Sequence, residues 1–562
     1  MTVEREVRPP AQANAPASAT GARPTGREAQ LAGAVAAGVA LGVGEIVTGF
    51  GSRNQSLVGS VGNEFIRDSG GGVARTAIRV LGTADKPSLV LGIVVVSLLF
   101  GALLGGAARR RPWIAVVGFA GFGLVGILAS ADDPLASTGL AVFAAICSVV
   151  AGLLTLFALL HVARTGHLLP TAPPPSNPSN RPINAPVDRG VRARPTDATA
   201  TRRAFFGWAA GAAAFGAATA LAGRSLRARS SIEAIRARIR LVRPTNQLLP
   251  PDAPTAFTTT GTPSFAVDGL SPYFVPNGDF YSIDTALVVP QVDVAHWKLS
   301  VTGKVDHPFT LTFDELQAMD QVEEAVTLSC VSNEVGGDLV GNARWQGVPL
   351  RTLLARAGVQ SGGTQIVGRS VDGFTVGFPT AALDDGRTAL VAVGMNGEPL
   401  PTVHGFPARL VVAGLYGYVS ATKWLSEIEL TGLDDFDAYW VPLGWAKEAP
   451  IKTQSRIDVP KGGATVKAGR TPIAGVAWAP DRGIRKVEVQ VDDGPWTEAQ
   501  LGRVLSKDTW CEWMLPWDAT PGTHTLRVRA TDDTGSTQTS KEAPPEPDGA
   551  TGWHSREVHV EG

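Results

Sequence analysis

Long apolar runs, broken by short polar connections, dominate the chain before about residue 225. A helix needs about 20 apolar residues to cross a bilayer, because all of its backbone polar groups must be hydrogen-bonded within the segment. Several runs meet this requirement and predict an all-α transmembrane region. The predicted spans are residues 31–50, 88–107, 113–129, 138–162 and 204–223.

Charges in the connections predict how these helices are oriented, because Lys and Arg accumulate in cytoplasmic loops. Residues 109–111 are all arginine and place the second connection inside, whereas Asp132 and Asp133 place the third outside. Seven arginines between residues 164 and 203 return the fourth connection to the cytoplasm. We therefore expect the amino terminus inside and everything after the fifth helix outside. Seven more arginines at residues 224–243 do not change this expectation, since long exported domains cross largely regardless of charge.

Two adjacent arginines precede the fifth helix, in Thr201-Arg-Arg-Ala-Phe-Phe-Gly207, after a Pro-rich linker at residues 170–195. With the Ala/Gly-rich run that follows, this segment resembles a twin-arginine export signal. Two interpretations stay open. The segment is either an uncleaved signal that also anchors the protein or an ordinary charged flank of a membrane helix.

Short alternating segments replace the apolar runs in the second half of the chain and predict soluble domains. Residues 312–319 form a predicted helix capped by Thr312, and a strand at residues 325–329 leads into Cys330. The mixture of strands and helices predicts an α+β domain over residues 266–445. Further strands are predicted at residues 284–290, 297–303, 366–378 and 409–413, and a further helix at residues 351–357.

Helical periodicity disappears in the last part of the chain. Residues 484–491 alternate strictly between apolar and polar side chains and turn at Asp493-Gly494. Residues 526–530 alternate in the same way. Short strands with turn signals predict an all-β, immunoglobulin-like sandwich over residues 446–562.

The chain is expected to be multi-domain, since 562 residues exceed what one hydrophobic core supports. A net charge of -1 leaves no basic surplus for a nucleic-acid partner. The remaining boundaries predict a disordered cytoplasmic tail at 1–30, a four-helix region at 31–162, a cytoplasmic linker at 163–200, the fifth helix at 201–224 and a second linker at 225–265.

The chain has three cysteines, Cys147, Cys330 and Cys511, which are too few for a disulfide scaffold. Cys330 ends an apolar, β-branched run and is followed by a polar, glycine-rich segment. Three interpretations are open from these residues alone. Cys330 is a small buried hydrophobic side chain, or it forms a disulfide with Cys511, or its thiolate binds a metal at the end of a strand.

Five blocks of sequence occur in order around and after Cys330. They are Thr327-Leu-Ser-Cys-Val-Ser-Asn333, Gly341-Asn-Ala-Arg-Trp-Gln-Gly-Val-Pro349, Met395-Asn-Gly-Glu-Pro-Leu-Pro401, His404-Gly-Phe-Pro-Ala-Arg409 and Thr422-Lys-Trp424. Together they resemble the molybdopterin-binding domain of the sulfite oxidase family over about residues 270–440. The tail, with Gly475-Val-Ala-Trp478 and Trp553-His554, looks like that family's carboxy-terminal immunoglobulin-like domain.

The resemblance implies a role for each matching residue. Cys330 matches the cysteine whose thiolate binds molybdenum, where soft sulfur suits a metal that changes oxidation state as an oxygen atom is transferred. Arg offers a planar fork and Lys a point charge to a phosphate, and His can donate to the phosphate or to the pterin. The residues implied to hold the cofactor are Asn277, Cys330, Asn333, His404, Arg409, Ser420 and Lys423, with the match at Asn277 the poorest.

Two departures from the family pattern argue against sulfite as the substrate. Sulfite oxidases typically carry Asn-Arg-Arg after the cysteine, whereas this chain has Asn333-Glu334-Val335, and a carboxylate would repel a doubly charged oxyanion. The family's active-site tyrosine has no clear counterpart in residues 371–377. We therefore expect a different or neutral small substrate, with sulfoxides among the candidates.

The resemblance also implies a cofactor and partners. The expected cofactor is molybdopterin with one molybdenum, and no sequence pattern for haem or iron-sulfur binding accompanies it. Electrons would then pass to or from a separate cytochrome or membrane redox protein, and family members often form homodimers. The expected protein is a cell-membrane enzyme whose last two domains lie outside the cytoplasm. The alternative is a non-catalytic envelope scaffold or receptor built on a degenerate molybdopterin domain.

Overall fold

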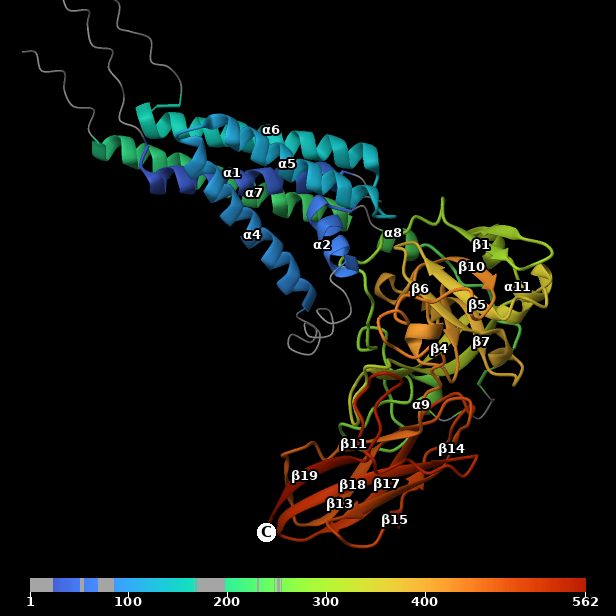
Figure 1. The fold of residues 1–562 in the computed structure, drawn as a ribbon. Helices are drawn as coiled ribbons and strands as arrows, with labels where there is room; N and C mark the ends of the chain where they lie inside the picture. Colours follow the sequence, from blue (N-terminus) through green and yellow to red (C-terminus); the bar gives the residue numbers. More distant parts are fainter. Residues whose placement is uncertain are drawn as a thin grey trace, which may run out of the picture.

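The computed structural model describes residues 24–50, 55–68, 85–165, 167–168, 198–229, 232–246, 248–249, 253 and 255–562. A bundle of long helices lies beside a mixed domain of strands and short helices, and a second β-rich domain follows at the carboxy-terminal end (Figure 1). The predicted Pro-rich linker at residues 170–195 lies outside the described residues.

The bundle contains five described helices that are long and apolar enough to cross a membrane, which is compatible with a membrane protein. They match the five predicted spans to within a few residues at most ends. Their bounds are Gly26–Gly49 (α1), Asp85–Ala108 (α4), Pro112–Ala131 (α5), Thr138–Thr165 (α6) and Ala198–Arg229 (α7). A further amphipathic helix, Leu57–Asp68 (α2), was not predicted, because its 12 residues are too short to cross a bilayer.

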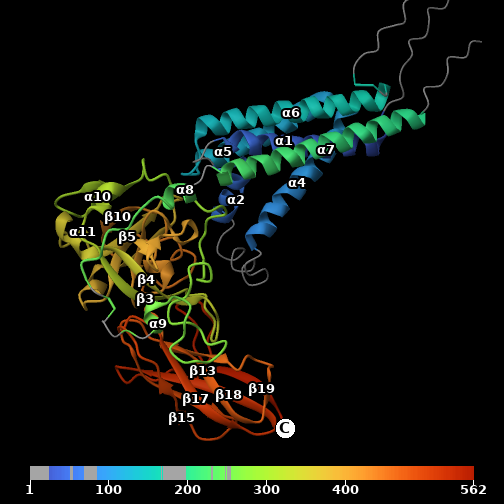
Figure 2. The same cartoon turned by 180° about the vertical axis from the view of Figure 1, so that it is seen from behind.

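Small residues let α1 pack closely against its neighbours. A side chain at Gly33 would collide with the backbone of Gly101 and Gly105 in α4, and one at Gly42 would collide with Gly216 in α7. Close approach of this kind is how helices associate where there is no hydrophobic driving force between them. Seen from behind, α4 slants away from the other long helices toward one end (Figure 2).

The predicted tail at residues 1–30 is wrong from Gly26 onward, where α1 begins. The reason is a capping box: the Thr25 hydroxyl accepts from the Glu28 N–H, and the Glu28 carboxylate accepts from the Thr25 N–H. The second predicted linker, residues 225–265, is also not an open connection. It contains α8 (Ile232–Arg236) and α9 (Thr255–Thr258), and Ile232 and Phe257 are both buried in the core of the domain that follows.

The mixed domain contains two sheets. One has the order β2-β1-β10-β5-β6, in which β1 and β10 are parallel and the other neighbours antiparallel. The other has the antiparallel order β3-β4-β7-β8, with β9 beside β7. The strands are Lys298–Gly303 (β1), Phe309–Thr312 (β2), Val322–Ser329 (β3), Val340–Pro349 (β4), Gln365–Ser370 (β5), Thr375–Pro379 (β6), Ala389–Met395 (β7), Glu398–Pro399 (β8), Arg409–Val412 (β9) and Leu425–Thr431 (β10).

Most predicted elements of this domain are present. The predicted helices are α10 (Phe313–Gln317), with Thr312 as its N-cap, and α11 (Leu350–Ala357). The predicted strand at residues 284–290 is wrong, because this segment is irregular. Asp284, at the start of this segment, instead contacts Lys86 of the helical bundle and Lys423 in the turn before β10.

The carboxy-terminal domain is built from strands, as predicted. Two sheets, β11-β13-β17-β16 and β12-β19-β18-β14-β15, share one apolar core that includes Ile473, Trp513, Val489 and Leu526. The predicted strand at residues 484–491 is β14 (Ile484–Val491). The others are Gln454–Val459 (β11), Thr465–Lys467 (β12), Gly469–Trp478 (β13), Thr497–Glu498 (β15), Gln500–Leu501 (β16), Cys511–Ala519 (β17), Gly522–Asp532 (β18) and His554–Glu561 (β19).

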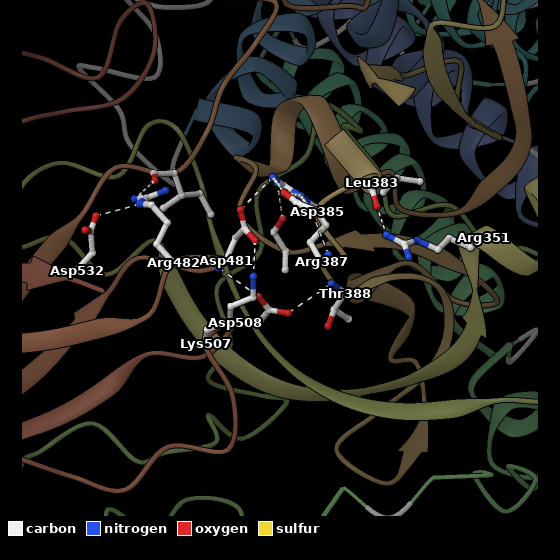
Figure 3. A network of polar contacts seen from close by, with 12 residues as sticks. Arg351, Leu383, Asp385, Arg387, Thr388, Asp481, Arg482, Lys507, Asp508 and Asp532 are labelled. Carbon is white, nitrogen blue, oxygen red and sulfur yellow. Dashed lines mark hydrogen bonds and ion pairs between the residues drawn. The ribbon is translucent and has the colours of Figure 1, made fainter. Parts of the chain in front are cut away.

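Polar contacts join the two β-rich domains next to β7 (Figure 3). The Arg387 guanidinium donates to Asp385 beside it and to Asp481 of the carboxy-terminal domain, 3.0 Å away. Lys507 donates to the same Asp481 carboxylate, and Asp508 accepts from the Thr388 N–H at 3.4 Å. These contacts hold the loop that contains residues 507–510 against the mixed domain.

The same loop supports the strand that ends at Cys330. The Asp508 carbonyl accepts from the Thr327 N–H at 2.9 Å, and the Thr327 hydroxyl accepts from the Trp510 N–H at 2.7 Å. Trp510 is fully buried, and its indole donates to the Tyr273 carbonyl. The carboxy-terminal domain therefore helps to fix the position of β3 and of the residue that follows it.

Candidate functional site

Cys330 lies directly after β3, at the start of a loop that is held at both ends. The Cys330 N–H donates to the Leu339 carbonyl, and the Asn333 side chain accepts from the Leu339 N–H, both at 2.9 Å. Arg456 of the carboxy-terminal domain donates to the Gly337 carbonyl at 2.7 Å. The loop that carries the cysteine is thus fixed from both domains.

All three cysteines are free, so the disulfide between Cys330 and Cys511 is wrong. Cys511 lies in β17, where its sulfur faces the backbone carbonyls of Gly502 and Glu512. Burial raises the pKa of the Cys330 thiol, against the opposing effects of hydrogen bonds from Ser332 and of the nearby Lys423 cation. A positive metal centre would stabilise the thiolate at this position.

His404 lies on the short 3-10 helix Thr402–His404 (η3) and is 1% exposed. Its Nε2 is 2.8 Å from the Asn277 carbonyl, which can only accept, so Nε2 carries the proton. Burial lowers the pKa of His404 to about 4, with Arg409 and Lys423 adding to the effect. The ring is therefore neutral at pH 7, and its buried Nδ1 is an acceptor with no partner among the described residues.

Arg409 begins β9 and is 4% exposed. Its guanidinium donates only to the backbone carbonyls of His404 and Leu410 and lies 4.9 Å from the centre of the Trp345 ring. No carboxylate of the described residues pairs with it, although burying a charge without a counter-charge is costly. Burial lowers the pKa of Arg409 to about 10. The site therefore holds a positive charge that no described carboxylate neutralises.

Lys423 lies in the turn before β10 and is 8% exposed. Its ammonium donates to the Ser282 hydroxyl and to the Asp284 carboxylate, each at 2.9 Å. The other oxygen of Asp284 accepts from Lys86 of α4 at 2.6 Å. Burial lowers the pKa of Lys423 to about 8, an effect that Asp284 opposes. Two lysines thus share one carboxylate, which leaves a surplus positive charge.

The structure brings Cys330, His404, Arg409 and Lys423 together. The Lys423 cation affects the titration of both Cys330 and His404, and Arg409 affects that of His404, as expected for groups in one site. These four residues come from the end of β3, η3, β9 and the turn before β10. They are close because β7 pairs with β9 and with β4, which itself pairs with β3.

The side chains of Asn277, Asn333 and Ser420 are engaged within the protein. Asn277 donates to Glu398 at 2.6 Å and orients His404 through its carbonyl. Asn333 braces the cysteine loop, as described above. The Ser420 hydroxyl, at the end of the helix Gly417–Ser420 (α12), donates to the backbone carbonyls of Leu415 and Tyr416 just before that helix. These three residues shape the site rather than present a free side chain to it.

Tyr281 is a site residue that the sequence patterns did not reveal. Burial raises its pKa, the Cys330 thiolate raises it further, and the Arg409 cation opposes both effects, so the phenol lies close to these two groups. Its ring stacks on Phe280, with ring centroids 5.2 Å apart. Residues 371–377, which follow the cysteine, contain no tyrosine, whereas Tyr281 belongs to the irregular segment before β1. Its proximity to Asn277 in the sequence was the one available signal.

Comparisons with known proteins agree with this arrangement. A family model described as the oxidoreductase molybdopterin binding domain matches residues 286–440. The uncharacterized oxidoreductase YuiH of Bacillus subtilis is 36% identical over 155 residues, which cover 27% of this chain and 74% of that protein. This chain belongs to the sulfite oxidase family of molybdopterin oxidoreductases.

Other relatives are similar over part of their length. Human mitochondrial sulfite oxidase is 30% identical over 322 residues, which cover 48% of this chain and 58% of that protein. The match therefore spans little more than half of the human protein. The crystal structure of the sulfane dehydrogenase SoxCD from Paracoccus pantotrophus is 24% identical, covers 52% of this chain and 84% of that chain, and superposes with a TM-score of 0.46.

The match to the molybdopterin binding domain implies a molybdenum cofactor. The described residues fit such a group on physical grounds. The cofactor's phosphate would neutralise the buried Arg409 and the surplus charge around Lys423. The buried Nδ1 of His404 has no partner among the described residues and would accept a hydrogen bond from a ring N–H of the cofactor.

Proposed function

We propose that this protein is a membrane-anchored molybdenum-cofactor oxidoreductase that catalyses two-electron oxygen-atom transfer on a small substrate outside the cytoplasm. Its electrons are exchanged with a separate redox partner. The observation that carries the proposal is the buried Arg409 guanidinium, which has no carboxylate partner among the described residues. A domain that bound no anion would gain stability by losing this charge.

In this proposal Cys330 is the protein's ligand to molybdenum, and Arg409 and Lys423 bind the cofactor phosphate. His404 accepts from the pterin, while Asn277, Asn333 and Ser420 hold the surrounding backbone in place. When bound, the cofactor supplies a two-electron couple and a site for oxygen-atom transfer. The roles of the protein's residues are to bind and orient it and to limit water around it.

The substrate is proposed to be uncharged, with sulfoxides as the leading class. Glu334 is exposed in the loop that follows Cys330, so its carboxylate contributes negative charge near the entrance of that loop. Tyr281 provides a phenol beside Cys330 and Arg409 that can donate a hydrogen bond to a neutral S=O oxygen.

The exchange Glu334→Arg tests this choice of substrate. It should raise the kcat/KM for sulfite by about tenfold or more, because a repulsive charge becomes an attractive one. It should leave the kcat/KM for a neutral sulfoxide within about twofold. Rapid sulfite turnover by the unmodified protein would contradict the proposal of a neutral substrate.

Contacts between the bundle and the mixed domain support an external location. Lys86 at the start of α4 contacts Asp284, Leu287 lies against Gly62 of α2, and Pro134 between α5 and α6 lies near Gly373. These bundle segments are the ones that the charge pattern places outside. With the arginine pair Arg202-Arg203 in the first turns of α7, they favour export of a folded domain through a twin-arginine signal.

The second candidate is an envelope scaffold without cofactor, in which the last domain is an immunoglobulin-like interaction module. Elemental analysis of the purified full-length protein separates the two. We expect about one molybdenum per chain from a host that makes the cofactor. Protein that is folded but free of molybdenum under those conditions would favour the scaffold.

A further inference from the structure

A cavity of about 590 Å³ lies within the helical bundle. Residues of α1, α2, α4, α5 and α6 line it. Four phenylalanines contribute to its wall, and two of them, Phe100 and Phe122, stack with ring centroids 6.2 Å apart. The size and lining suit a flat ring with a hydrocarbon chain.

One buried hydroxyl in this cavity has no partner. Ser148 of α6 is 9% exposed and lines the cavity, and its Oγ makes no hydrogen bond within the described protein. The hydroxyl lies against Gly44 of α1, where any larger side chain would displace it. A buried donor without an acceptor is unfavourable, so a ligand with a carbonyl oxygen would satisfy it.

The charges of the side chains that line the cavity indicate which kind of ligand head group can bind there. Among the described residues, no Lys, Arg or His lines the cavity. A phospholipid would place its phosphate against a lining in which these residues supply no cation to pair with it. A neutral carbonyl-bearing ring does not meet this problem.

The cavity also lies close to the cofactor site. Ser88 and Leu89 line it, and they follow Lys86 by two and three residues on α4. Lys86 contacts Asp284, and Asp284 contacts Lys423. Only one ion-paired carboxylate therefore separates the start of α4 from a cation of the proposed cofactor site.

We propose that this cavity binds a lipid-soluble quinone, which exchanges electrons with the cofactor site. This inference rests on the proposed function, which requires a separate redox partner, and it identifies that partner as the quinone. The overall reaction balances as substrate plus water plus quinone giving oxygenated product plus quinol. Two electrons and two protons pass to the quinone, and the reverse reaction reduces the oxygenated compound.

Gly92 offers a way to fill the cavity without disturbing the bundle. It lines the cavity, and a side chain added there would meet nothing within 4 Å. Gly121 of α5 is a matched control, because it also has open space around it but does not line the cavity. We expect Gly92→Phe to lower the quinone extracted per molybdenum by at least about fivefold, and Gly121→Phe to leave it unchanged.

A substrate-independent experiment tests electron exchange in the full-length holoprotein. The protein is reduced with a measured amount of dithionite and mixed with decylubiquinone, and the quinol formed is measured. We expect about one quinol per molybdenum in the wild type and in Gly121→Phe, and a rate at least tenfold lower in Gly92→Phe. Ser148→Ala should weaken the binding of decylubiquinone about fivefold, as loss of one hydrogen bond predicts.

The outcomes separate this inference from the proposed function. Ferricyanide is a water-soluble electron acceptor that does not need the cavity, so reoxidation by ferricyanide reports on the molybdenum centre alone. Extracts that contain only phospholipid, or equal quinone-linked rates in Gly92→Phe and Gly121→Phe, would overturn the quinone site while ferricyanide still reoxidised the protein. A protein without molybdenum that accepts no electrons from dithionite would instead overturn the proposed function.

Discussion

The carboxylate of Asp284 lies 2.9 Å from the ammonium of Lys423, although the two residues are 139 positions apart in the chain. Both are almost completely enclosed, with 12% and 9% of their side chains exposed. Burial opposes ionisation of Asp284, but Lys423 and Lys86 together hold its pKa below the ordinary value. This ion pair connects the helical bundle to the site and controls the charge that Lys423 can offer to an anion.

The exchange Asp284→Asn should make cofactor retention sensitive to pH. Asp284 raises the pKa of Lys423, so its loss moves that pKa below about 8. A lysine with a lowered pKa loses its charge as the pH rises, and we therefore expect more molybdenum to be lost on dialysis at pH 9 than at pH 6.5. Asp435→Asn, which removes the partner of exposed Lys304, is the control. Equal retention at both pH values in Asp284→Asn would show that Lys423 does not hold the cofactor.

Replacing Cys330 by serine tests the proposed metal ligand. We expect activity to fall on the order of 10²-fold or more, since even residues that only support a metal ligand commonly cost 10- to 100-fold. The electronic absorption of the metal-thiolate centre should change as well. Cys511→Ser is the matched control, because that cysteine is also free but lies in β17. Unchanged turnover and absorption in Cys330→Ser would remove the basis for the metal site.

The exchange Arg409→Met should have opposite effects on the two forms of the protein. Without cofactor, it removes a buried charge that no carboxylate balances, so the mixed domain should become more stable by about 1–3 kcal/mol. With cofactor, it removes a phosphate contact, so molybdenum content should fall by about tenfold or more. Thermal unfolding of protein made in hosts with and without cofactor synthesis measures the stability of the two forms, and elemental analysis measures the molybdenum content. A decrease in stability in both forms would mean that Arg409 has only a packing role against Trp345.

Glu512 should make the stability of the carboxy-terminal domain depend on pH. Burial raises the pKa of Glu512 to about 7, against hydrogen bonds from Ser264, so the folded state favours the protonated acid. Its contribution is fully present below the unfolded pKa of about 4.5 and is lost as the pH rises through about 7. We expect a loss of at most about 3 kcal/mol across this window.

The exchange Glu512→Gln imitates the protonated carboxyl and should flatten this dependence. Calorimetry at pH 5 and pH 8 should show a smaller difference in melting temperature for the variant than for the wild type. Glu557→Gln is a control for the effect of removing one acidic group, because Glu557 on β19 is exposed. If the variant and the wild type lost the same stability between the two pH values, another group would be responsible.

The sequence by itself determined the elements that depend on local pattern. The five long helices follow from the lengths of apolar runs, because a bilayer-spanning helix must satisfy its backbone internally. Strict alternation of apolar and polar residues predicted β14 at its observed bounds, and Thr312, as an N-cap residue, predicted the start of α10. The local pattern around Cys330 left three interpretations open, and the resemblance of the surrounding blocks to the sulfite oxidase family is what predicted that its thiolate binds a metal.

Only the tertiary structure decided which of these residues act together. Asp284 begins a segment that was predicted to be a strand, and Tyr281 lies just before that segment. Their roles depend on partners far away in the chain, Lys423 for Asp284 and Cys330 for Tyr281. The cavity in the bundle likewise depends on how several helices pack, since residues of α1, α2, α4, α5 and α6 line it. Periodicity reports which face of one element is buried, whereas the charge balance of a site is set by groups from several elements, and their distances exist only once the chain has folded.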